Sequence, residues 1–362
     1  MQRKVILTPI AWPHVLRKTG LRKFSNIKPR RNMMFSKMLV SAVTATALLS
    51  TLPAFARDLK LADFHSPSHF IVEEVYEPFA NAVSEATGGD LTVRLYMGGE
   101  LGPGPNEQYN RAVDGVADIV LAMPGYTAST FPLTLLADLP GVIDAETGTE
   151  RMLANIDKLS QEYRRVQLLA LWNNAPSFLF SATKPIRKLE DLAGMKVRVP
   201  SRNAGLVLEA WGGVPVSMPA SEVYNAMQTG VIDGAMIDAT ALTGFRLEEV
   251  TNYITVGMDT SISQFLMVMN LDSFQELSEE QQKAVLDAGQ EAARNGNRAW
   301  LGVASTALED FAGTEGKEVI TLSEEEIEKF NAATSTVVES VIEEVEATGV
   351  AARAYVEALQ ND

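Results

Sequence analysis

The chain has no cysteine among its 362 residues and only three histidines. Without cysteine it can form no disulfide, it cannot build a thiolate metal site, and it has no cysteine nucleophile. Basic residues are also scarce after position 56, because the 306 residues that follow carry 46 acids against 21 bases, a net charge of −25. A surface this acidic is not expected to bind nucleic acid.

Residues 1–56 lack acids altogether, and their composition is that of a targeting segment. Ten Lys or Arg precede a run of 12 small and apolar residues, Met38 to Leu49, and the segment ends in Ala54-Phe55-Ala56. A basic start, a short apolar run and an Ala-x-Ala ending are typical of a secretory signal peptide. A transmembrane anchor is the alternative, but a bilayer requires about 20 apolar residues. We therefore predict that residues 1–56 are a basic arm and a signal peptide that is cleaved after Ala56.

Between residues 185 and 238 the sequence pattern alternates between strand and helix. In Met195 to Val199 apolar residues alternate with two cations, which is typical of a strand with one buried face. Ser201 and Ser221 are candidate N-caps of the two helices. The pattern predicts helices at 204–211 and 222–229 and further strands at 214–217 and 231–237. This order predicts a parallel α/β sheet.

Arg198 stands at the end of the first of these strands. In parallel α/β sheets ligands bind outside the carboxyl ends of the strands, where this side chain is expected. The planar guanidinium donates two parallel hydrogen bonds to the oxygens of a carboxylate, so Arg198 is a candidate clamp for an organic acid. The pattern alone leaves a second interpretation open, in which Arg198 pairs at the surface with a protein acid such as Glu190 or Asp191.

Four segments together resemble one family. They are DLAGMKVRVP at 191–200, SEVYNAMQTGVIDGA at 221–235, ATGGDLTVRLYMGGELG at 86–102 and STFPLTLLADLP at 129–140. They are similar to the solute-binding proteins of TRAP (tripartite ATP-independent periplasmic) transporters of the DctP type, and the resemblance covers nearly all of the chain after residue 57. In that family the arginine that matches Arg198 binds the substrate carboxylate, so the resemblance favours the ligand role.

The resemblance also implies a fold and a division into lobes. The expected fold class is α/β, a two-lobe periplasmic binding protein fold with a ligand cleft between the lobes and one long helix spanning both. Ser278 and Gln281 form a candidate capping box for that helix, which then runs without proline to about Phe311. We expect the first lobe to comprise residues 57–175 with 264–303, and the second lobe residues 176–263 with 304–362.

The resemblance places the ligand between the lobes, and the ends of the predicted strands then supply candidate contacts. Asp238 is a candidate acceptor for a ligand hydroxyl, or a partner of Arg198 in the empty state. For Trp172, Met218 and Met236, packing in the core is an equally good interpretation. The predicted ligand-binding residues are His65, Tyr126, Trp172, Asn174, Phe178, Arg198, Met218, Met236 and Asp238.

The sequence offers no coherent catalytic or metal site. After residue 56 the histidines are His65 and His69, and Pro67 between them predicts a loop rather than a helix that presents both to one metal. His65 either lines the cleft or is a solvated loop residue. The chain has no Gly-x-Ser-x-Gly motif, and the glycine-rich loop at 98–106 lacks the spacing of a nucleotide site. We therefore expect no enzyme activity, no metal and no cofactor.

The expected function is that of a periplasmic solute receptor of a Gram-negative bacterium. It would bind a small organic acid, mono- or dicarboxylate, as a monomer and deliver it to integral-membrane TRAP subunits. Sialic-acid-type members carry a second arginine where this chain has residues 175–178, and Glu-Asn where it has residues 236–238, so a smaller or more hydrophobic acid is expected. The alternatives are a receptor for an ATP-driven importer or a sensor kinase, and a secreted enzyme.

Overall fold

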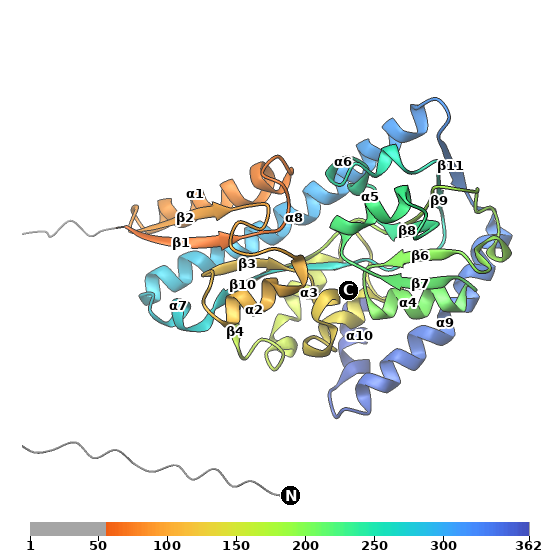
Figure 1. Cartoon of the computed structure of the whole chain (residues 1–362). Helices are drawn as coiled ribbons and strands as arrows, with labels where there is room; N and C mark the ends of the chain where they lie inside the picture. Colours follow the sequence, from red (N-terminus) through yellow and green to blue (C-terminus); the bar gives the residue numbers. More distant parts are fainter. Residues whose placement is uncertain (1–55, 362) are drawn as a thin grey trace, which may run out of the picture. The chain divides into compact units, whose positions relative to one another are not determined.

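The computed structural model describes residues 56–361, which form two β-sheets covered by helices (Figure 1). The predicted signal peptide and its basic arm lie outside the described residues, apart from Ala56 itself. In residues 56–361 no helix combines the length and the apolar character that crossing a membrane requires. The two sheets form the cores of the two lobes that the sequence predicts.

The first sheet joins strands from the beginning and the middle of the chain. Strand β1 pairs in parallel with β2 and β3, whereas β10 runs antiparallel to both β3 and β4. β10 is buried over its whole length, as its uninterrupted apolar pattern predicts. The order across the sheet is β2 (Leu91–Tyr96), β1 (Arg57–Ala62), β3 (Ile119–Ala122), β10 (Gln264–Asn270) and β4 (Val166–Asn173).

Two apolar cores cover the two faces of this sheet, since neighbouring residues of a strand point to opposite faces. Ile119 and Leu121 face one core, and Val120 faces the other. Pro78 lies in the first turn of α1, directly after a π-helical turn, where a proline is tolerated. The helical segments here are η1 (Val72–Tyr76), α1 (Glu77–Ala86), η2 (Pro105–Glu107), α2 (Gln108–Val113), η3 (Pro124–Thr130), η4 (Thr134–Asp138), α3 (Gly148–Ala154), η5 (Ile156–Leu159) and α7 (Leu271–Gln275).

The second sheet contains the strand that carries Arg198. As predicted, β6 runs parallel to β7 and β8, but β5 is antiparallel to β8 and β9, so the sheet is mixed. The order across the sheet is β11 (Glu318–Thr321), β9 (Tyr253–Val256), β5 (Phe178–Ser181), β8 (Gly234–Ile237), β6 (Lys196–Val199) and β7 (Val214–Ser217).

The helices of the second sheet begin where their caps allow. The hydroxyl of Ser201 accepts a hydrogen bond of 3.1 Å from the backbone N–H of Ala204, so Ser201 caps α4 as predicted. The cap predicted at Ser221 is wrong, because α5 begins at Ala220, two residues before the predicted start at 222, and Pro219 is its N-cap residue. The helical segments are η6 (Leu189–Leu192), α4 (Arg202–Ala210), α5 (Ala220–Gln228), α6 (Ala241–Gly244) and η7 (Leu247–Glu249).

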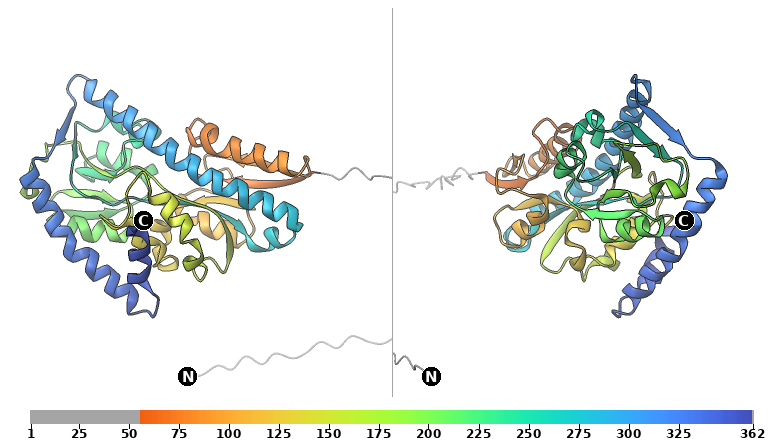
Figure 2. Two further views of the ribbon diagram at one scale, coloured as in Figure 1. Left: turned by 180° about the vertical axis from the view of Figure 1, so that it is seen from behind. Right: turned by 45° about the vertical axis from the view of Figure 1, so that its right-hand side comes forward.

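Helix α8 (Glu279–Gly313) is the long helix that the sequence predicts, with 35 residues and the capping box of Ser278 and Gln281. Its first half packs against β4, where Gly289 and Gly296 allow close approach. A Cβ on Gly289 would lie 2.3 Å from the carbonyl oxygen of Leu169, and one on Gly296 would lie 2.7 Å from the ring of Trp172. Its second half packs into the core of the second sheet, so the helix runs along both lobes (Figure 2).

The two C-terminal helices connect the lobes a second time. In α9 (Glu324–Glu346), Phe330 packs into the core of the second sheet and Val341 into that of the first. The last helix, α10 (Ala352–Gln360), contacts α3 and η4 of the first lobe, although the sequence prediction assigned residues 304–362 to the second lobe. The exact lobe boundaries stay a prediction.

Candidate functional site

Arg198 is held in a fixed position at the end of β6. Its side chain is 1% exposed. Nε donates to the carbonyl oxygen of Met218 at 3.0 Å, Nη1 donates to that of Met236 at 3.2 Å, and Nη2 donates to the hydroxyl of Tyr126 at 3.3 Å. These three contacts fix the plane of the guanidinium and leave further N–H groups for a ligand.

None of the residues in 56–361 forms an ion pair with Arg198. Burial lowers the pKa of Arg198, and the nearby Tyr126 and Asp238 oppose that shift. Asp191, one of the suggested surface partners, instead accepts from the backbone N–H of Arg187. Because an arginine stays charged when it is buried, the site contains a cation that no carboxylate of the described residues contacts directly.

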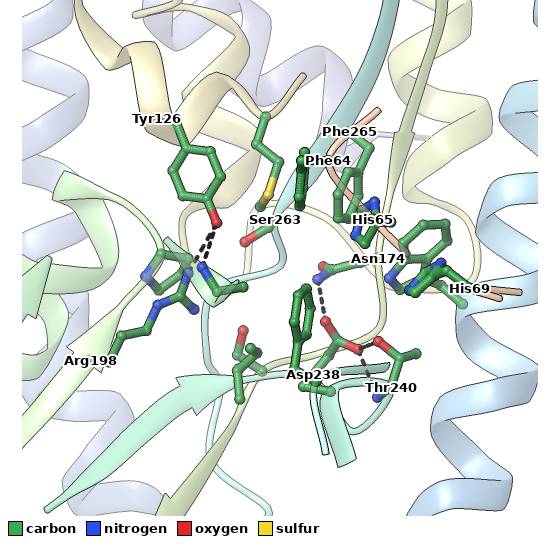
Figure 3. Close-up of a pocket in the computed structure, with 18 residues that line it drawn as sticks. Phe64, His65, His69, Tyr126, Asn174, Arg198, Asp238, Thr240, Ser263 and Phe265 are labelled. Carbon is green, nitrogen blue, oxygen red and sulfur yellow. Dashed lines mark hydrogen bonds between the residues drawn. The ribbon is translucent and has the colours of Figure 1, made fainter. Parts of the chain in front are cut away.

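Tyr126 connects the two lobes at this cation (Figure 3). Tyr126 lies in η3 of the first lobe. Its hydroxyl oxygen accepts a hydrogen bond from Arg198 and a second one, of 3.1 Å, from the backbone N–H of Ala220. Since both contacts use the oxygen as acceptor, the hydroxyl hydrogen is left to donate to a third group. The pair of Arg198 and Tyr126 therefore offers several donors to one anionic group.

Asp238, after β8, supplies the acidic side of the site. Its carboxylate accepts from Asn174 Nδ2 at 2.8 Å, from the backbone N–H of Thr240 at 2.9 Å and from the Thr240 hydroxyl at 2.5 Å. Burial raises the pKa of Asp238, and the hydrogen bonds from Thr240 and Asn174 oppose the shift. Asp238 is thus tied to its own neighbours rather than to Arg198.

The two histidines stack at the far side of the site, with ring centres 4.2 Å apart (Figure 3). His65 Nδ1 lies 3.0 Å from both oxygens of the buried Asp63, which also accepts from the hydroxyl of Tyr76 at 2.7 Å. Burial alone would raise the pKa of Asp63, but His65 and Tyr76 reverse this and the pKa is lowered. The carboxylate therefore holds the proton of His65 on Nδ1.

In His69 the Nδ1 atom is a hydrogen-bond acceptor, whereas in His65 it carries the proton. His69 Nδ1 accepts from the backbone N–H of Ile71 at 3.3 Å. Burial, together with the neighbouring His65, lowers the pKa of His69 to about 3. His69 is therefore neutral and carries its hydrogen on Nε2.

Apolar side chains complete the walls of a cavity that lies between these polar groups. Its empty volume is about 460 Å³ when the open solvent at its mouth is included. Several walls are aromatic, and the Phe265 and Trp300 rings lie 4.7 Å apart. The lining consists of Phe64, His65, His69, Met123, Tyr126, Asn174, Ser177, Arg198, Pro200, Ala220, Ile237, Asp238, Thr240, Ala241, Phe245, Ser263, Phe265 and Trp300.

Five of the nine predicted ligand residues line this cavity, and four do not. His65, Tyr126, Asn174, Arg198 and Asp238 line it. Of the remaining four, Trp172 is buried against Phe265, and Phe178 packs beside the core of the second sheet. Met218 and Met236 contact Arg198 only through their backbone carbonyl oxygens.

The aromatic walls were missed by the sequence prediction. Phe245 follows a short helix and Trp300 lies in the middle of α8, and neither position stands at a strand end. His69 was considered only as a metal ligand. In residues 56–361 no group of three or more potential ligands is arranged to hold a metal ion.

A family model and several known proteins match this chain. The family model for bacterial extracellular solute-binding proteins, family 7 (DctP), matches residues 61–344. A Salmonella typhimurium protein, the uncharacterized YiiZ, is 32% identical over 248 residues, which cover 66% of this chain and 75% of that protein. The ectoine-binding periplasmic protein TeaA of Halomonas elongata is 27% identical over 283 residues, 75% of this chain and 82% of TeaA.

Solved structures share the fold. A TRAP solute-binding protein from a marine metagenome, from an unidentified microbe and specific for aromatic acid ligands, was crystallised with 3-hydroxybenzoate. It superposes with a TM-score of 0.79 at 26% identity, over 84% of this chain and 97% of the other. A second structure of the same protein, with metahydroxyphenylacetate, gives a TM-score of 0.78, also at 26% identity, over 84% of this chain and 97% of the other.

Proposed function

The chain belongs to the DctP family of bacterial extracellular solute-binding proteins, the receptors of TRAP transporters for small ligands, and we propose that its ligand is an organic carboxylate held by Arg198. Family and fold are those of a binding protein rather than of an enzyme. The membership also favours a TRAP partner over the ATP-driven importer or sensor kinase considered above. The finer proposal is a periplasmic monomer that passes its acid to the integral-membrane TRAP subunits.

The observation that carries the proposal is a buried cation that forms no ion pair within the described residues. Removing a charge from water is costly unless a partner of opposite charge compensates. In residues 56–361 Arg198 has only neutral acceptors, whereas Asp238 is occupied by Thr240 and Asn174. A ligand carboxylate would complete the coordination of Arg198 and accept the free hydrogen of Tyr126.

The apolar lining supports a ligand with a compact, apolar body. Phe64, Phe245, Phe265 and Trp300 line the cavity. Aromatic rings favour offset or edge contacts with another ring, so an aromatic acid suits these walls. A similar protein that binds aromatic acids supports the same choice.

A thermal-shift screen of monocarboxylates, dicarboxylates, 2-oxo acids and aromatic acids tests this function. We expect aromatic monocarboxylates to raise the melting temperature of the wild type but not that of Arg198→Met, which keeps an unbranched side chain without charge. Arg187→Met is the matched control, since Arg187 is half exposed and pairs with Glu318 outside the cavity. Mass spectrometry of the released ligand should find it unchanged. An acid that stabilises Arg198→Met as strongly as the wild type would contradict the proposal.

A further inference from the structure

We infer that the cavity selects carboxylates whose body carries a hydroxyl, and that Asn174 is the residue that reads this hydroxyl. The inference rests on the proposed function and refines it. Its starting point is an atom that the proposed carboxylate contact leaves unused. Asn174 Oδ1 is buried and has no hydrogen-bond partner.

The orientation of the Asn174 amide is determined by its neighbours. Nδ2 donates to Asp238 Oδ2 at 2.8 Å, and the backbone N–H of Asn174 donates to the carbonyl oxygen of Ser263 at 2.9 Å. Turning the amide over would place its oxygen against the carboxylate of Asp238, where two acceptors would repel each other. Thr240 holds Asp238 in turn through two hydrogen bonds. The acceptor Oδ1 is therefore fixed and cannot exchange places with Nδ2.

Asn174, whose side chain carries this unpaired oxygen, is one of the residues that line the cavity. Of the cavity-lining residues in the described part of the chain, Asn174 alone has a buried side-chain oxygen or nitrogen without a partner. The residue is 3% exposed, so bulk water does not solvate it in the closed cavity. Figure 3 shows Asn174 beside Asp238, across the cavity from the guanidinium of Arg198. A ligand that reaches from Arg198 to Asn174 needs an anion at one end and a donor at the other.

A buried acceptor that stays unpaired costs more than a hydrogen bond contributes when it forms. A carboxylate ligand without a hydrogen-bond donor would leave this oxygen unpaired in the closed cavity. Its binding free energy would then include the cost of that unpaired acceptor. An acid with a hydroxyl would satisfy the oxygen in the same closed state. Sites of this kind discriminate strongly against the analogue that lacks the group, because the protein atom is then left without a partner.

Isothermal titration at pH 7 with matched acids tests the inference. The pairs are 3-hydroxybenzoate with benzoate and mandelate with phenylacetate, which differ only by the hydroxyl. For at least one pair we expect the wild type to bind the hydroxy acid about 5- to 150-fold more tightly, the range for one buried unsatisfied acceptor. In Asn174→Ala the ratio within that pair should fall to about twofold or less.

Asn203→Ala is the matched control. Asn203 is also a buried asparagine, but its Nδ2 donates to the carbonyl oxygen of Leu135 at 2.9 Å, outside the cavity. This variant should keep the wild-type ratio even if it weakens both acids. Equal affinities within every pair in the wild type, or an unchanged ratio in Asn174→Ala, would overturn the inference while leaving the carboxylate proposal standing. Failure of every acid to bind would remove the proposed function, and the inference with it.

Discussion

Two buried charged side chains lie where the lobes meet, and they solve the same problem in different ways. Arg198 and Asp138 are each 1% exposed, and among the described residues neither forms an ion pair. Arg198 donates to three neutral acceptors and borders the ligand cavity. Asp138, in η4, accepts from the hydroxyl of Ser201 across the lobes, while its Oδ1 has no partner.

The difference follows from the chemistry of the two groups. A guanidinium keeps its charge when it is buried, so Arg198 needs an anion from outside the chain. A carboxyl group can instead become neutral by binding a proton. Burial raises the pKa of Asp138 to about 7, and the hydrogen bond from Ser201 opposes the shift. The cation thus marks the proposed ligand site, whereas the acid marks a contact between lobes that depends on a proton.

The surroundings of Asp138 favour the neutral form. Together with Gly125 and Gln264 it lines a small gap beside the ligand cavity, and the Oε1 of Gln264 also lacks a partner. No other titratable side chain lines that gap in residues 56–361. Two unpaired acceptors facing one gap require a donor, and a proton on Asp138 would supply it.

The largest expected effect tests the cation. Arg198→Ala should weaken binding of a carboxylate ligand by about 2 to 5 kcal/mol, the range for truncating one partner of a buried charge pair. Titration calorimetry with an acid from the screen measures this. Arg187→Ala, at an exposed pair with Glu318, should leave the affinity unchanged. Equal losses in the two variants would remove the distinction between a buried and an exposed arginine.

The next largest effect concerns Asp138 and is the pH dependence of the free energy of unfolding. The folded pKa of Asp138, about 7, lies above its ordinary value of 3.8, so the folded state binds more protons. Asp138 should therefore lower the free energy of unfolding as pH rises from about 4 to 7, by up to about 4 kcal/mol, with no further change above that. Denaturant unfolding of the wild type and Asp138→Asn at several pH values measures the difference between them.

In Asp138→Asn this contribution should be absent, so the difference from the wild type should vary across that pH range. Asp90→Asn, at an exposed position, is the control and should show no such variation. A difference between wild type and Asp138→Asn that is constant from pH 4 to 7 would show that Asp138 is not protonated on folding.

A smaller effect tests the close approach that buries both groups. A Cβ on Gly125 would lie 2.9 Å from the carbonyl oxygen of Pro200, across the junction of the lobes. Gly125→Ala should therefore resist closure and weaken ligand binding by about 1 to 3 kcal/mol, as overpacking does. Gly302→Ala is the control, because a Cβ there meets open space. Unchanged affinity in Gly125→Ala would mean that the contact can relax at no cost.

The smallest effect concerns a charge pair in water. Arg202 and Glu344 lie 2.8 Å apart with side chains 54% and 57% exposed. Removing such a pair typically changes stability by less than about 1 kcal/mol. Arg202→Ala should therefore alter the unfolding free energy only slightly, and added salt should reduce even that difference. A loss comparable to that of Arg198→Ala in binding would contradict the role given to burial.

The position of Arg198 near the end of a parallel strand could be predicted from the sequence, because apolar residues alternate with cations there and turn residues follow. Its role toward a ligand stays a prediction. The capping box of Ser278 and Gln281 predicted the start of α8, and the run without proline to about Phe311 predicted its approximate length. The aromatic residues that line the cavity could not be predicted from the sequence. Periodicity tells which face of a helix is buried, but not that Trp300 and Phe245, far apart in the chain, close one cavity.

Asp138 was also missed, although a signal was present. It is the one charged residue in LTLLADLP at 133–140, a segment that entered the sequence prediction only through the family resemblance. A lone acid within such a run is rarely buried without a partner. Its partner, Ser201, belongs to the other lobe and had already been assigned as a helix cap. Ser201 does both, and only the assembled fold brings its hydroxyl to Asp138.

The glycines of α8 have a mechanical consequence. Gly289 and Gly296 allow the first half of this helix to pack closely against the first sheet, and Phe311 packs the second half into the core of the second sheet. Trp300, in between, is part of the cavity wall. A change in the curvature of α8 would therefore move one wall of the cavity relative to the two sheets.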